Sequence, residues 1–214
     1  MRERVIARLA RHRPGRRGFG GSADPEEAAA FRRAIGSDRQ LNPGFTPPSA
    51  ALRAAAVLVP LIDRQGGTTV LLTQRTPHLT AHAGQISFPG GRIEEHDADP
   101  TAAALRETEE EVGLARERVA VVGRLDSYVT GTGFDIAPIV GIVTPPFELR
   151  IDPFEVAEAF EVPLEFILDR RNHQRVERES AGRRRAFFVL PYEGRNIWGA
   201  TAGILVNLAE VLAE

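Results

Sequence analysis

Short apolar runs separated by turn residues occupy most of the chain after residue 53. The runs AAAVLVPLI (54–62) and TTVLLTQR (68–75) are rich in leucine and β-branched residues, and the turn-forming sequence DRQGG separates them. This pattern is typical of two adjacent strands. QISFPGG (85–91) indicates a third, short strand that ends on two glycines. The first part of this region therefore predicts a β-sheet.

The second part continues the pattern and adds helices. VAVVGRLDSYV (119–129) and FDIAPIVGIV (134–143) are predicted strands joined by the Gly-rich TGTG, and RRAFFVLPYEG (184–194) is a late strand. Apolar residues at helical spacing predict a partly helical segment at 155–169 and a closing amphipathic helix at 201–214. Together with one more helix, considered below, this order of elements predicts a mixed α/β or α+β domain.

The first 50 residues have a different composition. Residues 1–21 contain seven arginines and one glutamate, a pattern found in mitochondrial transit peptides and in basic arms that bind nucleic acid. We favour a short amphipathic helix with a solvated basic face. A second helix is expected at 25–35, where Asp24 can cap a helix that starts with proline. We expect residues 1–50 to form an extension that lies on a main domain at 51–214.

Overall composition narrows the function classes. The 214 residues carry a net charge of −2, which points to neither a nucleic-acid nor a membrane partner. No apolar run approaches the roughly 18–20 residues needed to cross a bilayer. The absence of cysteine excludes disulfides, thiolate metal sites and a cysteine nucleophile, and favours a reducing compartment such as the cytoplasm. All 27 basic residues are arginine, so amine chemistry is excluded as well. The oligomeric state is left open.

One predicted helix crowds acidic residues together in the sequence RETEEEVG. Asp99 and the proline after it can begin this helix, and Gly113 can end it in a left-handed conformation. At 100° per residue, Glu107, Glu110 and Glu111 fall within about 100° of one another, whereas Glu109 points away. Oxygen ligands without sulfur suit Mg²⁺ or Mn²⁺. The alternative is a solvated acidic face without a metal.

The residues around this helix resemble the signature of the Nudix hydrolases. That signature has a glycine, an acidic residue six positions later, then Arg-Glu, Glu-Glu, and a closing glycine with an apolar residue. The matching positions are Gly91, Asp97, Arg106, Glu107, Glu110, Glu111, Gly113 and Leu114. The gap from Asp97 to Arg106 is one residue longer than usual, and Thr108 replaces an apolar residue. The resemblance implies a mixed sheet between helices, with a loop–helix–loop metal site.

The resemblance also implies roles for single residues. Glu107, Glu110 and Glu111 would hold Mg²⁺ or Mn²⁺, and the backbone carbonyl of Gly90 would add a ligand. Arg106 would orient one of the carboxylates through a bidentate ion pair rather than contact the substrate. Glycines at 90 and 91 suit a loop that turns sharply and passes close to metal and phosphate.

The upstream segment 71–91 is similar to the one that marks the coenzyme A diphosphatases within the family. The matching positions are Leu71, Leu72, Thr73, Arg75, Gly84, Phe88, Pro89, Gly90 and Gly91. Thr76 stands where Ser or Ala is usual, and Thr80 where Arg is usual. This resemblance implies hydrolysis of coenzyme A to 4′-phosphopantetheine and adenosine 3′,5′-bisphosphate. Alternatives are another nucleoside diphosphate derivative, such as ADP-ribose, NADH or an oxidised nucleotide, and a non-catalytic nucleic-acid or regulatory protein.

The general base has several candidates. Family members often use a glutamate on a later loop, which here suggests Glu155 or Glu158. His82 lies next to the predicted metal loop, where a histidine could act as base or phosphate donor; we favour a hydrogen-bonding role for it. Arg75, His82 and Phe88 are the predicted substrate-binding residues, and a structural ion pair is the alternative for Arg75.

Three further features have weaker interpretations. The segment 170–185 contains seven arginines and two glutamates, so it is a candidate site for the 3′-phosphate, although a solvated hairpin tip is the simpler reading. Trp198 is expected in the core rather than as a platform for a base. The TGTG sequence at 130–133 lacks the lysine of a phosphate-binding P-loop, so we expect a turn that borders the substrate cleft.

Overall fold

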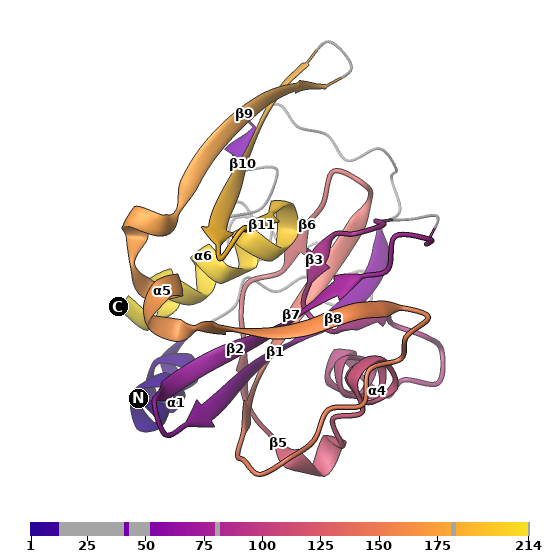
Figure 1. The fold of residues 1–214 in the computed structure, drawn as a ribbon, viewed down its shortest axis with the longest axis vertical. Helices are drawn as coiled ribbons and strands as arrows, with labels where there is room; N and C mark the ends of the chain where they lie inside the picture. Colours follow the sequence, from indigo (N-terminus) through magenta and orange to yellow (C-terminus); the bar gives the residue numbers. More distant parts are fainter. Residues whose placement is uncertain (13–40, 43–51, 80–81, 181–182, 214) are drawn as a thin grey trace, which may run out of the picture.

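The computed structural model describes residues 1–12, 41–42, 52–79, 82–180 and 183–213 (Figure 1). The helix expected at 25–35 lies outside these ranges, and so does Thr80, which stands where the related segment usually has an arginine. Among the described helices, none is both long enough and apolar enough to cross a membrane.

A mixed sheet forms the centre of the molecule, as the sequence predicts. Its main path runs β3-β2-β1-β7-β5, in which β1 and β7 are parallel and the other neighbours are antiparallel. Three more strands join it: β4 pairs with β1, β6 with β7 and β8 with β2. The strand bounds are β1 Arg53–Arg64, β2 Gly67–Arg75, β3 Ile86–Ser87, β4 Gly90–Arg92, β5 Val119–Arg124, β6 Tyr128–Val129, β7 Phe134–Val143 and β8 Val156–Pro163.

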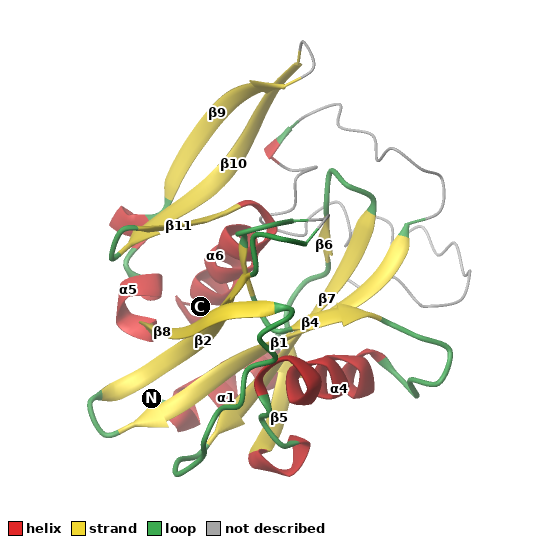
Figure 2. Cartoon of the chain, turned by 45° about the vertical axis from the view of Figure 1, so that its right-hand side comes forward, coloured by secondary structure: helices red, strands yellow, loops and turns green. Residues whose placement is uncertain are grey.

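Apolar layers cover both faces of this sheet. Successive side chains of a strand point to opposite faces, and β1 is apolar on both. Leu58 and Ile62 pack in the layer shared with helix α4 (Pro100–Val112), whereas Val59 and Leu61 pack in the layer shared with helix α6 (Gly199–Ala213). Figure 2 shows α4 and α6 on opposite sides of the sheet. The sheet therefore holds α4, and the side chains on its exposed face, in a fixed position.

The amino-terminal segment forms the short amphipathic helix expected from the sequence. In α1 (Arg2–Arg11), Val5 and Leu9 are buried in the layer that also contains α6, and most of the arginines are exposed. The guanidinium of Arg4 donates a hydrogen bond to the carbonyl of Leu212 (3.1 Å). The two ends of the described chain thus lie together (Figure 1).

A second, three-stranded sheet projects from the main body. It has the order β11-β10-β9, with bounds β9 Gln174–Ser180, β10 Arg183–Tyr192 and β11 Arg195–Trp198. The sequence predicted β10 but not β11. In Figure 1 the β9–β10 hairpin extends away from the main sheet, above α6.

One sequence-based assignment holds only for part of its segment, and a second is wrong. The segment 155–169 is helical in part, as predicted, but only in the short helix α5 (Leu164–Leu168). Most of it is the strand β8, because pairing with Thr69–Arg75 of β2 overrides the helical spacing there. The closing helix α6 is buried almost all round rather than amphipathic, since the main sheet, α1, α5 and the hairpin surround it. The predicted strand at 119–129 is divided into β5 and β6.

Packing in the sheet predicts one intolerant glycine. A Cβ added at Gly141 of β7 would collide with Cγ1 of Val119 and lie 3.2 Å from Cδ1 of Leu58. We expect Gly141→Ala to lower the free energy of unfolding by about 1–3 kcal/mol, because the core is overpacked there. Urea denaturation measures the change. Gly66→Ala is the control, since a Cβ at Gly66 meets nothing within 4 Å; equal stability of the two variants would contradict the packing described.

Candidate active site

The acidic helix α4 has the capped ends that the sequence predicts. Asp99 accepts a hydrogen bond from the backbone N–H of Ala102 (2.8 Å), and Gly113 ends the helix with φ at 67°. Thr108 is fully buried, and its hydroxyl donates to the carbonyl of Ala104 (2.6 Å). This internal hydrogen bond explains how a threonine takes a position that is apolar in the family pattern: no buried polar group is left unsatisfied.

Arg106 connects the loop before α4 to the acidic face of the helix. Its Nε and Nη2 donate to the two carboxylate oxygens of Asp97 at 3.0 and 2.9 Å, which is the bidentate arrangement. Its Nη1 donates to Glu107 (2.8 Å) and to Glu110 (3.3 Å), and Nη2 also reaches the carbonyl of Arg92 (3.2 Å). We expected a helix carboxylate as the bidentate partner of Arg106, but the structure shows that the partner is Asp97.

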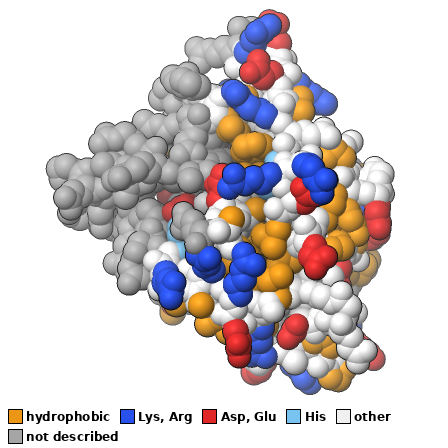
Figure 3. Space-filling model, turned by 90° about the vertical axis from the view of Figure 1, so that its left-hand side faces the viewer, with side chains coloured by type: hydrophobic (Ala, Val, Ile, Leu, Met, Phe, Trp, Pro, Cys, Tyr) orange, Lys and Arg blue, Asp and Glu red, His pale blue; other side chains and the backbone are white. Residues whose placement is uncertain are grey.

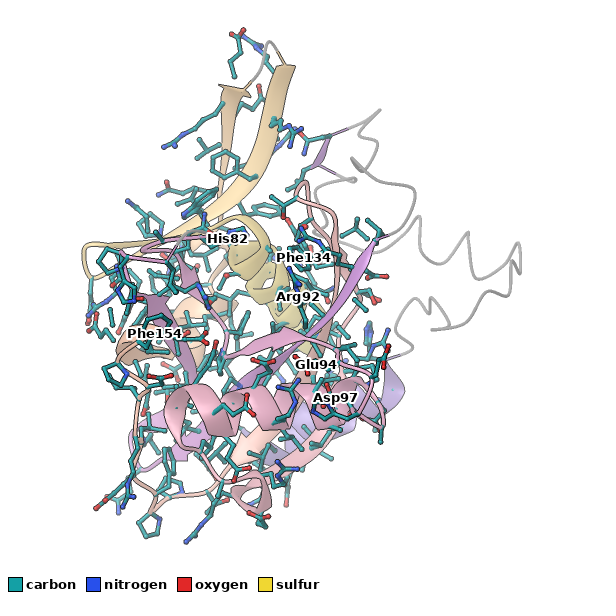
Figure 4. The ribbon with its side chains drawn as sticks, turned by 90° about the vertical axis from the view of Figure 1, so that its right-hand side faces the viewer. His82, Arg92, Glu94, Asp97, Phe134 and Phe154 are labelled. Carbon is teal, nitrogen blue, oxygen red and sulfur yellow. The ribbon has the colours of Figure 1, made fainter. Side chains whose placement is uncertain are left out.

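Asp97 is held firmly in the loop despite the extra residue before Arg106. Its side chain is 3% exposed, and it also accepts a hydrogen bond from the backbone N–H of Glu94 (2.9 Å). The hydrogen bonds from Arg106 lower the pKa of Asp97 to about 2. Figure 4 shows Glu94 and Asp97 near the amino-terminal end of α4, with Phe154 near its other end. The longer loop therefore still delivers a carboxylate to the arginine.

The three helix glutamates have different environments. Glu111 is 5% exposed and accepts a hydrogen bond from the backbone N–H of Gly90 (3.2 Å). Burial raises the pKa of Glu111 to about 8, and burial also raises the pKa of Glu107. Glu110, by contrast, has a 62% exposed side chain. Negative charge on the two inner carboxylates is thus unfavourable without a nearby cation.

These acids have the chemistry that suits a hard divalent cation. Within the described ranges, no group of three or more His, Asp or Glu side chains has the geometry of a metal site. The reason lies in their present partners: Arg106 holds Glu107 and Glu110, and Gly90 holds Glu111. Burial raises the pKa of Glu107 and of Glu111, and a divalent ion bound at these carboxylates would favour their charged forms.

The glycines before α4 are required by close packing against β1 and the acidic helix. Gly90 has φ at 148°, and a Cβ there would lie 2.5 Å from the carbonyl oxygen of Ala56. A Cβ at Gly91 would collide with the carboxylate of Glu107. Gly90 also pairs with Val57 of β1. The loop is thereby fixed to the sheet on one side and in contact with the acidic helix on the other.

Of the two later glutamates, Glu155 is connected to the acidic helix through Arg75. Arg75 lies between it and Glu111, with N–O distances of 3.6 Å to each. Glu158 instead accepts a hydrogen bond from Arg195 (2.5 Å). Arg75 is therefore in an ion-pair network, the alternative left open for it, and it also lines the cavity described below.

Thr76, which the sequence analysis noted only as a departure from a pattern, fixes the loop that carries Glu155. It is 4% exposed, and its hydroxyl donates to the carbonyl of Phe154 (2.8 Å). Its backbone N–H donates to the carbonyl of Glu155 (3.0 Å). No signal in the sequence could have revealed this contact, because the two segments are far apart in the chain.

A cavity of about 700 Å³ opens beside the glycine loop. Arg75, His82, Gly90 and Gly91 line it, and the Thr130–Thr132 part of the TGTG turn lines it as well. His82 has φ at 59°, and its Nδ1 is 2.7 Å from Oε1 of Gln85. Figure 4 shows His82, Arg92 and Phe134 between α4 and the hairpin.

Two aromatic residues differ from expectation. Phe88 touches the cavity, but its side chain is 2% exposed and packs in the core next to α6, so its contribution to the cavity wall is small. Trp198, which the sequence analysis placed in the core, is 43% exposed and lines the cavity. The sequence did not predict the strand β11, whose last residue is Trp198.

Comparison with known proteins agrees with the geometry. Residues 52–179, more than half of the chain, match the family described as NUDIX domain. The chain belongs to the Nudix family. Nudix hydrolases are pyrophosphohydrolases, and they generally use divalent metal ions. Membership in this family supports hydrolase activity on a nucleoside diphosphate derivative.

Individual relatives cover most of the chain. A protein of Escherichia coli K12, described as an uncharacterized Nudix hydrolase NudL, is 40% identical over 170 residues, which is 79% of this chain and 88% of the relative. A protein of the same description from Salmonella paratyphi B is 41% identical over the same shares. The Nudix hydrolase RenU of Mycobacterium smegmatis has a crystal structure that matches with a TM-score of 0.50 and 21% identity, over 77% of this chain and 88% of RenU, and so shares the fold.

Burial of Glu111 in this Nudix helix predicts how the stability of the metal-free protein depends on pH. Its folded pKa of about 8 lies above the ordinary value of 4.5, so between these values the folded state holds a proton that the unfolded state releases. The free energy of unfolding should therefore be highest near pH 5 and fall as the pH rises to 8. The lowered pKa of Asp97 acts only below pH 4 and does not oppose this slope.

Urea denaturation in EDTA at several pH values between 5 and 8 measures this slope. Glu111→Gln should make the slope clearly smaller, because the group with the larger shift is gone and only Glu107, whose pKa is also raised, still contributes. Glu109→Gln should preserve it, since Glu109 lies on another side of the helix and pairs with Arg116 (3.0 Å). A flat profile for the unmodified protein would contradict the described burial.

Proposed function

We propose that the protein is a Mg²⁺- or Mn²⁺-dependent coenzyme A diphosphatase that releases 4′-phosphopantetheine and adenosine 3′,5′-bisphosphate. One observation supports this most strongly. The segment 71–91 resembles the corresponding segment of that group, and part of it lies between the acidic helix and the cavity. Arg75, Gly90 and Gly91 contact glutamates of the helix and also line the cavity. A volume of about 700 Å³ is in the range that accommodates a nucleotide-sized ligand.

The acidic residues would hold the metal. Glu107, Glu110 and Glu111, with the backbone carbonyl of Gly90, supply the hard oxygen ligands that magnesium and manganese prefer. A divalent metal bound there would neutralise phosphate oxygens and favour ionisation of water. Arg106 stays bonded to Asp97 and keeps the helix side chains directed toward the same face.

Glu155 is the best-placed general base. Its carboxylate is 43% exposed, so water can reach it, and the contacts with Arg75 and Thr76 hold it beside the helix. His82, on the cavity wall, would donate a hydrogen bond to a phosphate oxygen, which leaves Glu155 to accept the proton of the attacking water.

The nearest alternative is that the substrate is another nucleoside diphosphate derivative, since the metal helix would contact only the diphosphate and not the groups attached to it. ADP-ribose, NADH and an oxidised nucleotide such as 8-oxo-dGTP represent this class. The buried acidic residues weigh against a non-catalytic binding protein, because a protein that only binds has no physical need for carboxylates with raised pKa values.

A substrate panel decides between these functions. The purified protein is incubated with coenzyme A, ADP-ribose, NADH or 8-oxo-dGTP in Mg²⁺, Mn²⁺ or EDTA, and the products are separated by chromatography. We expect metal-dependent release of adenosine 3′,5′-bisphosphate from coenzyme A. Cleavage of one of the other compounds but not of coenzyme A would refute the substrate assignment, while the metal-binding role of the helix would still hold.

The metal role of the helix face predicts a large effect of one conservative substitution. Glu110→Gln should reduce kcat by about 100-fold or more, since it removes a charged metal ligand. Stability should change by less than about 0.5 kcal/mol, because the side chain is exposed. Glu109→Gln is the matched control, one residue away on the same helix, and should retain activity. Turnover by Glu110→Gln within a few fold of the unmodified protein would contradict the assignment.

A further inference from the structure

The cavity extends well beyond the residues needed to cleave a diphosphate. From the glycine loop and Arg75 it continues to Phe187 and Trp198 on the second sheet, and to Arg178 and Arg185 near the end of the β9–β10 hairpin. We call these last four residues the hairpin patch. A single ligand with its diphosphate at α4 could therefore place one of its ends on this patch.

The register of the hairpin places two arginines side by side. Arg185 lies directly opposite Arg178 in the antiparallel pair, and Glu179 lies opposite Arg184. Since successive side chains alternate between the faces of a strand, the two paired arginines share one face of the hairpin. Glu179, next to Arg178 in the chain, also lines the cavity. Figure 3 shows basic and acidic side chains next to each other at the upper end of the molecule, where the hairpin lies.

The two paired arginines bring positive charge to this end of the cavity. Arg178 and Arg185 are both exposed and both line the cavity. Arginine is well suited to bind phosphate through several N–H groups. With two arginines against Glu179, the hairpin end of the cavity lining is basic and suits a negatively charged ligand group, although the whole chain is slightly acidic.

The same face offers an aromatic surface next to the arginines. Phe187 lies two residues after Arg185 on β10, so it points to the same side. Its ring meets that of Trp198 edge-on, with centroids 5.7 Å apart. An indole that is 43% exposed inside a cavity presents an apolar surface to which a planar base can bind by stacking.

Asn42 fixes this part of the hairpin. Its amide donates to the carbonyl of Ala186 (3.0 Å) and accepts from the N–H of the same residue (2.7 Å), as a neighbouring strand would. Ala186 stands between Arg185 and Phe187 in β10. The backbone that carries the arginine and the aromatic ring is thus held in place before any ligand binds.

We propose that the hairpin patch binds the nucleoside end of the substrate, with the base against Trp198 and Phe187 and a phosphate outside the diphosphate between Arg178 and Arg185. The proposal rests on the proposed function, in which that extra group is the 3′-phosphate of coenzyme A. In this proposal the hairpin determines which diphosphate substrate is bound, whereas α4 carries the metal-binding residues that cleave the diphosphate of any such substrate.

Trp198 allows a direct test, because it is the only tryptophan in the chain. Its fluorescence is followed during titration with adenosine 3′,5′-bisphosphate, adenosine 5′-monophosphate or 4′-phosphopantetheine in the presence of Mg²⁺. We expect a saturable change with the bisphosphate, at least about 10-fold weaker binding of the monophosphate, and no change with phosphopantetheine. Equal affinity for the two adenosine compounds, or a response to phosphopantetheine, would overturn the proposal.

Kinetics with coenzyme A and 3′-dephospho-coenzyme A separate the two parts of the patch. Arg178→Gln or Arg185→Gln should raise KM for coenzyme A by about 10-fold and leave KM for the dephospho compound unchanged. Trp198→Leu should raise KM for both by about 10-fold, and Trp198→Phe should recover most of the loss.

Arg175→Gln is the matched control, because Arg175 is on the same strand but the opposite face, where it pairs with Glu177 (3.7 Å). It should behave as the unmodified protein. Equal effects of Arg178→Gln on both substrates, or an effect of Arg175→Gln as large, would refute the phosphate site. If the unmodified protein does not cleave coenzyme A, the proposed function fails, and the fluorescence titration still decides whether the patch binds the bisphosphate.

Discussion

The bidentate bond between Arg106 and Asp97 is the interaction on which the rest of the site depends. Three glutamates close together on one helix repel each other, and a cation within the fold is needed to hold them in the absence of metal. Arg106 meets this need from the same helix, and Asp97, almost completely buried, fixes the position of the guanidinium. The raised pKa of Arg106, caused first by its hydrogen bonds with Asp97, shows how strongly this cation is retained.

A second arginine balances the other end of the acidic face. Arg75 lies between the buried Glu111 and the exposed Glu155, while Thr76 next to it fixes the Glu155 loop. Even so, burial keeps the pKa of Glu111 about as high as 8, so the two arginines do not fully compensate the inner carboxylates. The metal-free site is thus organised but short of positive charge. This is the electrostatic condition under which a divalent ion binds favourably.

Local chemistry determined which features could be predicted from the sequence. The ends of α4 follow from Asp99, Pro100 and Gly113, and the β1–β2 pair follows from a Gly-containing turn between apolar runs. What failed depends on distant pairing: β8 has a helical pattern but is recruited by β2, and Trp198 is exposed because of a strand that no local pattern indicated. The role of Thr76 and the cavity face of the hairpin likewise arise only when segments far apart in sequence meet.

The central claim is that the acidic face of α4 holds the catalytic metal, and a crystal structure with bound Mn²⁺ tests it most directly. Anomalous scattering locates manganese independently of any assumption about its ligands. The account predicts manganese bound by Glu107, Glu110 and Glu111 near the carbonyl of Gly90, with Arg106 still bonded to Asp97. Manganese bound elsewhere in a protein that is active under the same conditions would contradict it.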